Sequence, residues 1–303
     1  MNIKNKTQFQ KDHIPWNKDN GINKTCQICG KIFYIILSRH KDNRGKFCSK
    51  KCMKNRFIKA SNEFVLNKDM AELIGIVIGD GCISKYSNQN SYRIFISGNP
   101  VEDKYYLENH VVRLIKKCIK QKPSIYHGKN GALIVQFQNE AFRLFLKNLG
   151  IAERKSGTVK IPRQIMEDPK LLRRCIKGIA DTDFTLIFTK AHKNKNHYPR
   201  ISANFKSRNL VKDLEKALRS MNFTLNTTYD FKQEDKKRKK SWIINSIKLD
   251  GPHNLDRWLK LINFSNIRII SRYEVWKKNG YLKPNTTLPE RLEELGWVGG
   301  DKK

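Results

Sequence analysis

The chain has 303 residues and a formal net charge of +33, from 61 Lys and Arg against 28 Asp and Glu. That length suggests about two domains, and positive charge spread along the whole chain favours nucleic acid as a partner over a merely solubilising surface. The first sixteen residues hold no apolar stretch of the kind that directs secretion, and Leu73 to Ile78 is too short an apolar run to cross a bilayer. We expect an intracellular protein of the cytoplasm, nucleoid or an organelle, with no membrane partner and no secretion.

Residues 1–60 form the first predicted unit, a small basic module that holds four of the seven cysteines. An odd cysteine count without an export signal argues against a disulfide framework and for reduced thiols that bind metal. The pairs Cys26–Cys29 and Cys48–Cys52, separated by a loop, have the spacing of tetrahedral Zn²⁺ ligands. His40, which lies between the pairs, is the alternative ligand. A segment this short is expected to depend on the metal for its stability.

Segment 46–52 resembles the second knuckle of treble-clef-like zinc fingers. Nine Lys and Arg residues lie between Lys31 and Arg56. They favour an auxiliary contact with nucleic acid, and a purely structural finger is the alternative.

The rest of the chain is predicted to be an internal duplication, with repeats at 69–152 and 169–265 and a helical extension at 266–303. Periodicity gives each repeat the order αββαββα, and therefore an α+β fold. After the opening helices, the predicted segments are 92–97, 101–118, 124–127, 132–138 and 142–150 in the first repeat, and 200–206, 209–221, 224–232, 242–249 and 255–264 in the second.

Each repeat opens with an apolar helical phrase that ends in a carboxylate. The phrases are Leu73–Gly81 and Ile176–Phe184, and their carboxylates, Asp80 and Asp183, are 103 residues apart. A helix C-terminus carries partial negative charge, so an Asp there is locally unfavourable. Because the same local rule is broken twice at equivalent places, the charge is expected to have a use.

Small residues four apart are expected to let the two phrases pack closely, Gly75 and Gly79 in one and Gly178 and Thr182 in the other. Close packing would carry both carboxylates to one end of a helix pair. Carboxylates are ligands that Mg²⁺ prefers, and phosphodiester hydrolysis uses such ions to neutralise the phosphate and activate water. The minor groove is only about 6 Å wide, so adjacent helix ends suit chemistry on both strands of a duplex.

Alternation along the predicted strands separates an apolar from a polar face. Ile201, Ala203 and Phe205 share one face of 200–206, and Leu225, Tyr229 and Phe231 share one face of 224–232. A one-sided sheet packs helices on its apolar face, and the amides, hydroxyls and cations opposite suit base edges in a major groove; an ordinary solvated face is the alternative. The side chains predicted to contact DNA are Arg93, Gln136, Gln138, Arg200, Ser202, Asn204, Lys206 and Lys232.

The two phrases resemble the LAGLIDADG motif of homing endonucleases, with Asp80 and Asp183 at its penultimate, acidic position. Two motifs in one chain resemble the single-chain, pseudo-twofold members of that family. The resemblance covers about residues 70–280 and implies two pseudosymmetric repeats that form a β-saddle on a long, asymmetric double-stranded DNA target. It also implies a monomer, encoded by an intron or other mobile element, that cuts both strands with Mg²⁺ held by the two aspartates.

Family members place a basic residue near each metal site, after the closing helix. Lys155, with its neighbour Arg154, matches that place in the first repeat, and Arg268 matches it in the second. These residues would stabilise charge that develops on the phosphate. Contact with the phosphate backbone is the alternative.

Two features of the second phrase depart from the family pattern. Phe184 stands where glycine is usual, and we expect it to distort a left-handed turn and slow the second centre. Asp181 offers a second acid, which instead would cap or hydrogen-bond nearby backbone. The alternative function is a non-cleaving nucleic-acid binder, either an intron maturase with intron RNA as its partner or a regulator on a decayed nuclease scaffold.

Overall fold

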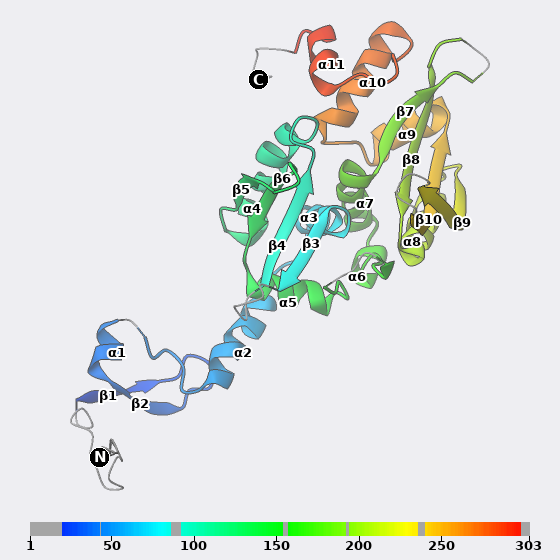
Figure 1. Cartoon of the computed structure of the whole chain (residues 1–303). Helices are drawn as coiled ribbons and strands as arrows, with labels where there is room; N and C mark the ends of the chain where they lie inside the picture. The colour runs from blue at the N-terminus through cyan, green and yellow to red at the C-terminus, as the bar shows by residue number, and fades with distance from the viewer. Residues whose placement is uncertain are drawn as a thin grey trace, which may run out of the picture. The chain divides into compact units, whose positions relative to one another are not determined.

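The computed structural model describes residues 20–42, 44–85, 92–153, 157–191, 194–235 and 240–297. They fall into two compact units, one that ends at Glu63 and one that begins at Phe64 (Figure 1). Within the described residues no helix has both the length and the apolar character needed to span a membrane.

The first unit is a β-hairpin followed by two helices. Strand β1 (Gly21–Thr25) pairs antiparallel with β2 (Ile32–Ile36), and α1 (Leu37–Lys41) and α2 (Lys50–Ser61) follow. Helix α2 begins where the hydroxyl of Ser49 accepts the backbone N–H of Cys52 at 3.1 Å, the usual role of a serine N-cap.

This first unit has almost no apolar core. Its buried residues, among those described, are Cys26, Ile35, Cys52 and Ser61. Two of the four are cysteines, so burial of aliphatic side chains contributes little to its stability. A fold of this size with so small a core needs another source of stability, such as a bound metal ion.

The second unit contains the order αββαββα twice, as predicted. The first repeat comprises α3 (Lys68–Ile78), β3 (Gly81–Lys85), β4 (Tyr92–Gly98), the continuous helix η1–α4 (Tyr106–Val111 and Val112–Ile119), β5 (Ser124–His127), β6 (Leu133–Phe137) and α5 (Glu140–Asn148). The second comprises α7 (Pro169–Asp183), β7 (Thr185–Thr189), β8 (Tyr198–Phe205), α8 (Arg208–Ser220), β9 (Asn226–Asp235), β10 (Lys240–Asp250) and α9 (Pro252–Leu261). Helix α6 (Arg163–Met166) joins the repeats, and α10 (Ile267–Asn279) and α11 (Leu288–Glu294) follow them.

Each repeat forms a four-stranded antiparallel sheet, in the order β3-β4-β6-β5 or β7-β8-β10-β9. The predicted segments omit β3 and β7. Both are strands of only five residues that directly follow a motif helix, and so short a stretch offers little alternation to detect.

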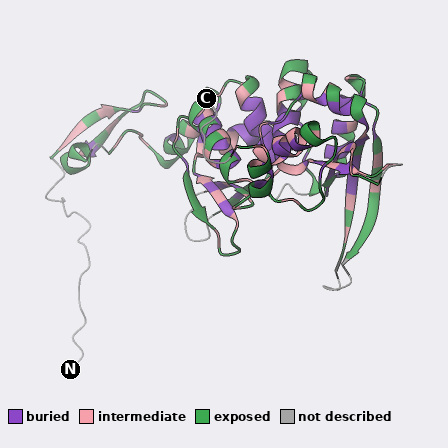
Figure 2. Cartoon of the chain, turned by 90° about the horizontal axis from the view of Figure 1, so that it is seen from above, coloured by how far each residue is buried: buried purple, intermediate pink, exposed green. Residues whose placement is uncertain are grey.

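Helices α3 and α7 pack side by side between the two sheets (Figure 1), where buried residues are concentrated (Figure 2). Their backbones touch through glycine. A Cβ atom on Gly75 would lie 2.1 Å from the carbonyl oxygen of Cys175, and one on Gly178 would lie 2.2 Å from that of Glu72. No larger residue fits at either position without separating the helices, so the predicted close helix pair is confirmed.

The C-terminal helices α10 and α11 hold the first repeat as well as the second. The buried guanidinium of Arg291 forms an ion pair with Glu102 at 2.7 Å, and the backbone N–H of Leu288 donates to the same carboxylate at 2.5 Å. The amide of Asn266, the N-cap of α10, donates to Asp103 at 2.9 Å. The extension therefore couples the two repeats near the ends of the motif helices.

Candidate functional site

The two motif carboxylates lie where α3 and α7 end. Asp80 follows α3 and Asp183 is the last residue of α7, and both are half-buried. A Cβ atom on Gly79 would lie 2.0 Å from the hydroxyl of Thr182 and 2.2 Å from Oδ2 of Asp183. The side chain of Asp183 therefore lies against the residue that precedes Asp80, and the structure brings both predicted acids to the same end of the helix pair.

Asp80 lines a polar pocket formed mainly by the first repeat. Its lining residues are Asp80, Ser97, Gly98, Asn99, Pro100, Asp103, Asn130, Gly131, Ala132 and Thr182. Asp103 is a second carboxylate that the sequence analysis missed. Asn99 caps the following turn, with its Oδ1 accepting the N–H groups of Val101 and Glu102 at 2.8 and 3.0 Å. That cap signals only the start of a helix, so no motif points to Asp103.

Arg268 contacts two of the residues that line the Asp80 pocket. Its Nε is 3.1 Å from Oδ1 of Asp103, and its Nη2 donates to the backbone carbonyl of Thr182 at 3.2 Å. Both partners line the pocket of Asp80, so this arginine of α10, which follows the second repeat, is placed at the pocket of the first. Lys155, predicted for the other centre, lies outside the described residues.

Asp183 lines a different pocket. The lining residues are Ile78, Gly79, Gly81, Cys82, Ile83, Val159, Asp183, Asn204, Phe205, Lys206, Ser207 and Leu210. Apart from Asp183 its charged side chain is that of Lys206, which is exposed and which the sequence analysis assigned to DNA contact. The two carboxylates thus share a helix-pair end but have different surroundings.

The expectation that Phe184 distorts the second motif is wrong. Phe184 has φ −82° and ψ 153°, which is ordinary extended backbone, and its N–H donates to the carbonyl of Ala180 at 3.1 Å. Its ring is fully buried, with centroids 5.4 Å from Trp258 and 6.0 Å from Phe205. Gly81, its counterpart, serves close packing instead, since a Cβ there would lie 2.5 Å from the backbone of Val77. The first motif needs glycine at this position because a side chain would clash with Val77. In the second motif the side chain at the same position is part of the aromatic core around Trp258.

Asp181 is a structural acid, the role that the sequence analysis offered as the alternative to metal binding. It is fully buried, and its Oδ1 accepts the backbone N–H groups of Ser265 and Asn266 at 2.7 and 3.0 Å. Burial raises the pKa of Asp181, and the nearby Lys177 opposes that effect. The carboxylate fixes the chain just before α10 and thereby the position of Arg268.

Glu72, His110 and Asp181 also bring ligand-type atoms within 4.8 Å of one another in the interior. The ammonium of Lys177 already lies there, 3.0 Å from Glu72 and 3.6 Å from Asp181. Burial alone would raise the pKa of Glu72, but the hydrogen bond from His110 and the charges of Lys177 and Arg174 outweigh it and lower that pKa to about 2. A lysine therefore takes the position of a cation in this cluster, which bridges the two motif helices.

The predicted polar faces lie as expected in most places. Arg93 and Gln136 alternate with buried residues of the first sheet, and Arg200, Ser202 and Asn204 do so in β8. Some are already engaged: Arg200 pairs with Asp250 at 2.5 Å, and Gln136 accepts the hydroxyl of Tyr126 at 2.9 Å. Gln138 and Lys206 are exposed just past the ends of β6 and β8. We call the face of the second sheet that carries Ser202 and Asn204 its outer face.

The predicted faces of β9 are wrong beyond Asp230. In the register of β9 with β10, Thr228 faces Ser246 and Phe231 faces Ile244. Between these pairs Tyr229 and Asp230 lie opposite Asn245 alone, so a bulge exchanges the faces of β9 beyond it. Phe231, predicted to be inward, is 56% exposed and lies on the outer face, whereas Lys232 lies on the opposite one.

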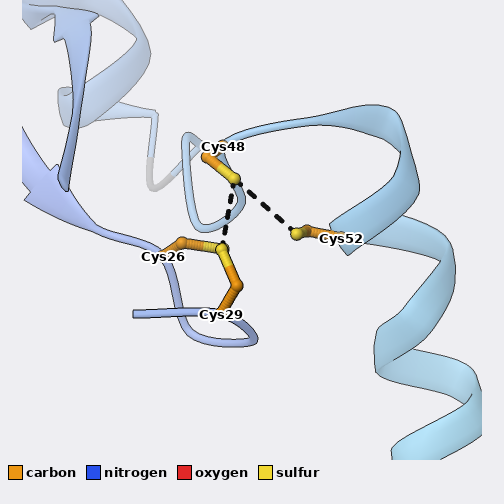
Figure 3. A group of neighbouring side chains, drawn as sticks. All are labelled: Cys26, Cys29, Cys48 and Cys52. Carbon is orange, nitrogen blue, oxygen red and sulfur yellow. Dashed lines mark hydrogen bonds between the residues drawn. The ribbon is translucent and has the colours of Figure 1, made fainter. Parts of the chain in front are cut away.

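In the first unit, four thiols gather at one point (Figure 3). Cys26 and Cys29 come from the turn between β1 and β2, and Cys48 and Cys52 from the start of α2. The Sγ atom of Cys48 lies 3.5 Å from Sγ of Cys29 and 3.6 Å from Sγ of Cys52. The sulfur atoms of all four cysteines lie within 4.8 Å of one another. Thiolates 2.3 Å from a tetrahedral zinc are about 3.8 Å apart, so the set fits Zn²⁺. His40 is not part of this described group.

The pKa values of two of these thiols are displaced in opposite directions. The N–H of Cys29 is the main cause of a Cys26 pKa lowered to about 6. Thiol contact with Cys29 is the main cause of a Cys48 pKa raised to about 12. Metal binding requires deprotonated thiols, so a bound cation would replace the protons of this group.

No protein-family model and no curated protein matches the chain. Among solved structures, the chain is similar to the homing endonuclease I-DmoI in complex with DNA and Mn, at 16% identity and a TM-score of 0.46, covering 66% of this chain and 98% of that one. It is similar to the homing endonuclease I-WcaI bound to its DNA recognition sequence (18%, TM-score 0.42, 74% and 92% covered). It is also similar to the N-terminal LAGLIDADG domain of DUF199/WhiA (12%, TM-score 0.42, 68% and 87% covered). These neighbours are homing endonucleases and a LAGLIDADG domain.

Proposed function

We propose that this protein is a homing endonuclease, a site-specific and metal-dependent enzyme that cuts both strands of double-stranded DNA. The observation that carries the proposal is the meeting of two motif carboxylates at one end of a glycine-packed helix pair. Cleavage of a duplex requires two reaction centres across a groove about 6 Å wide. Adjacent helix ends supply one acid each, and one chain supplies both, so we expect a monomer to suffice.

The donor chemistry at the helix ends suits Mg²⁺. Oxygen ligands from one or two carboxylates, with phosphate and water, are what this ion prefers, and Asp80 and Asp183 offer them at two half-buried positions. When bound, the ions would neutralise the scissile phosphate and lower the pKa of water. Arg268 and Lys206 would hold the phosphate, because Lys206 lines the Asp183 pocket and Arg268 contacts two residues that line the Asp80 pocket.

Charge and sheet geometry support duplex DNA as the substrate. A net charge of +33 favours a polyanion, and each sheet presents polar side chains opposite its buried face. Arg93, Gln136, Ser202 and Asn204 have the donors and acceptors that recognise base edges in a major groove. Two sheets in tandem would follow a long, asymmetric target, since the repeats differ in sequence.

The four-thiolate group is proposed to hold a structural Zn²⁺. Because the first unit buries so few side chains, removal of zinc by a chelator is expected to unfold it while the second unit keeps its own core. Titration of the metal-free protein with Co²⁺ should produce the absorption of tetrahedral thiolate coordination. Cys48→Ser should lose that absorption, and unchanged absorption in this variant would contradict the assignment.

The test of the endonuclease starts with duplexes selected from a randomised library by binding to the full chain in Ca²⁺. The selected duplexes are then incubated with Mg²⁺ and either the wild-type chain or the double variant Asp80→Asn, Asp183→Asn. We expect the wild type to cut both strands and the variant to be slower by on the order of 10³-fold or more. Selective binding by both proteins with cutting by neither would support the non-cleaving binder instead.

A further inference from the structure

The distal part of the β9–β10 hairpin carries three apolar side chains on the outer face of its sheet, one exposed and two half-buried. Closer to the core that face is polar, with Ser202, Asn204, Ser246 and Lys248 paired across the strands. Beyond Asp230 it changes character. Phe231 faces Ile244. Trp242 lies on the same face, two residues before Ile244 in β10 and nearer to the tip of the hairpin. Phe231 is 56% exposed and the other two are half-buried.

A hydrogen-bonded bulge at Asp230 turns Phe231 to the outer face. Asp230 has φ +55°, and its N–H donates to Oδ1 of Asn245 at 3.0 Å. Asn245 is itself buried, and its Nδ2 donates to the carbonyl of Lys206 at 3.2 Å. The carboxylate of Asp230 forms an ion pair with Arg208 at 2.5 Å. Bulges held in this way re-aim side chains, and here the bulge brings an aromatic ring onto the face that the proposed function assigns to DNA.

The charges near this surface indicate which kind of partner binds to it. The sequence that joins β9 to β10, Lys236 to Lys239, is entirely basic, and Lys248, paired with Ser202, adds a positive charge on the outer face. Those charges favour a polyanion. A DNA major groove admits a two-stranded ribbon, and the apolar group that it presents is the C5 methyl of thymine, which aliphatic and aromatic side chains contact.

The geometry points to Phe231, Trp242 and Ile244 as a surface that recognises thymine methyl groups in the half-site covered by the second repeat. This inference rests on the proposed function and adds the chemistry of its selectivity. From Phe231 to Asp235 the strand rises about 13 Å, at about 3.3 Å per residue. That length corresponds to about four base pairs, so the thymine preference is confined to a short segment of one half-site.

Ile243 provides a matched control. It is as exposed as Phe231, at 56%, but it faces Lys232 on the opposite side of the ribbon. Full-length Phe231→Ser and Ile243→Ser proteins, each checked for unchanged melting temperature, would be put through the same selection from randomised duplexes in Ca²⁺. Thymine enrichment within one segment of about four base pairs is expected for the wild type and Ile243→Ser, and its loss is expected for Phe231→Ser.

The second arm replaces the enriched thymines in a selected duplex with deoxyuridine, which removes only the methyl group. Wild-type binding should weaken about four-fold for each buried methyl, whereas Phe231→Ser should bind both duplexes equally. Equal binding by the wild type, or loss of the preference in Ile243→Ser, overturns the inference while leaving the endonuclease proposal intact. A protein that selects no sequence at all overturns both. A dimer of the free wild-type protein that dissociates in Phe231→Ser would assign the surface to a second copy and also overturn the inference.

Discussion

The two pockets at the end of the helix pair occupy equivalent places in the two repeats, yet their chemistry differs. The Asp80 pocket contains a second carboxylate, Asp103, and Arg268 is bound to that carboxylate. The Asp183 pocket contains an exposed lysine, Lys206, among apolar side chains. The repeated backbone places the acids, and the segments after β4 and β8 decide which charges accompany them.

This difference has a consequence for the proposed reaction. In the Asp80 pocket Asp103 adds a second carboxylate, and Arg268 is paired with it at 3.1 Å. The Asp183 pocket has one carboxylate, Asp183, and one exposed cation, Lys206, among its lining residues. We therefore expect the two strands of a target to be cut at different rates by two unequal centres.

The largest effect is expected from separating the helices, which would abolish both pockets at once. In Gly178→Val the new Cβ would lie 2.2 Å from the carbonyl oxygen of Glu72 and 2.8 Å from the N of Ile76, so α3 and α7 must move apart. We expect a loss of at least about 3 kcal/mol in the free energy of unfolding, measured by urea denaturation. Gly157→Ala is the control, because a Cβ there meets nothing within 4 Å; equal stability of both variants would contradict the packing described here.

The next largest effect is expected from variants that slow one centre and leave the other unchanged. Asp103→Ala removes the partner of Arg268, and we expect cleavage of one strand to slow by on the order of 10- to 100-fold with the other strand unaffected. Lys206→Met should slow only the other strand, by a similar factor. The measurement is single-turnover cleavage of a selected duplex with a different label on each strand. Equal slowing of both strands by either variant would show that the pockets do not act separately.

A smaller effect concerns the buried charges that join the motif helices. The pKa of Glu72 falls from 4.5 to about 2 on folding, so its contribution to stability is present above pH 4.5 and is lost as the pH falls towards 2. That contribution is about 3 kcal/mol. Glu72→Gln should lower the melting temperature at pH 7 and lessen its decline between pH 5 and pH 2. Glu153→Gln, at an exposed position, is the control, and parallel melting curves for both variants would argue against a stabilising role for Glu72.

Local patterns in the sequence predict much of this molecule. The repeated phrase locates Asp80 and Asp183, glycine spacing predicts the helix pair, and cysteine spacing predicts the thiol group. Each of these follows from residues that are near one another in the chain or that recur at a fixed spacing. They are therefore visible without knowledge of tertiary contacts.

What the sequence could not provide depends on contacts between distant segments. Asp103 matters because Arg268, from the C-terminal helix α10, lies 3.1 Å away. Phe231 turns outward because the buried amide of Asn245 holds a bulge at Asp230. Phe184 is tolerated because Trp258 and its neighbours surround the ring. Alternation and motif spacing contain none of this information.

The most direct test of the account compares the single variants Asp80→Asn and Asp183→Asn on one selected duplex with each strand labelled. If each carboxylate serves one strand, each variant should nick a single strand in Mg²⁺, and the two variants should nick opposite strands. Binding in Ca²⁺, measured alongside, should stay within a few-fold of the wild type. Loss of cutting on both strands in either variant, or full cutting of both strands, would contradict two paired but separate centres.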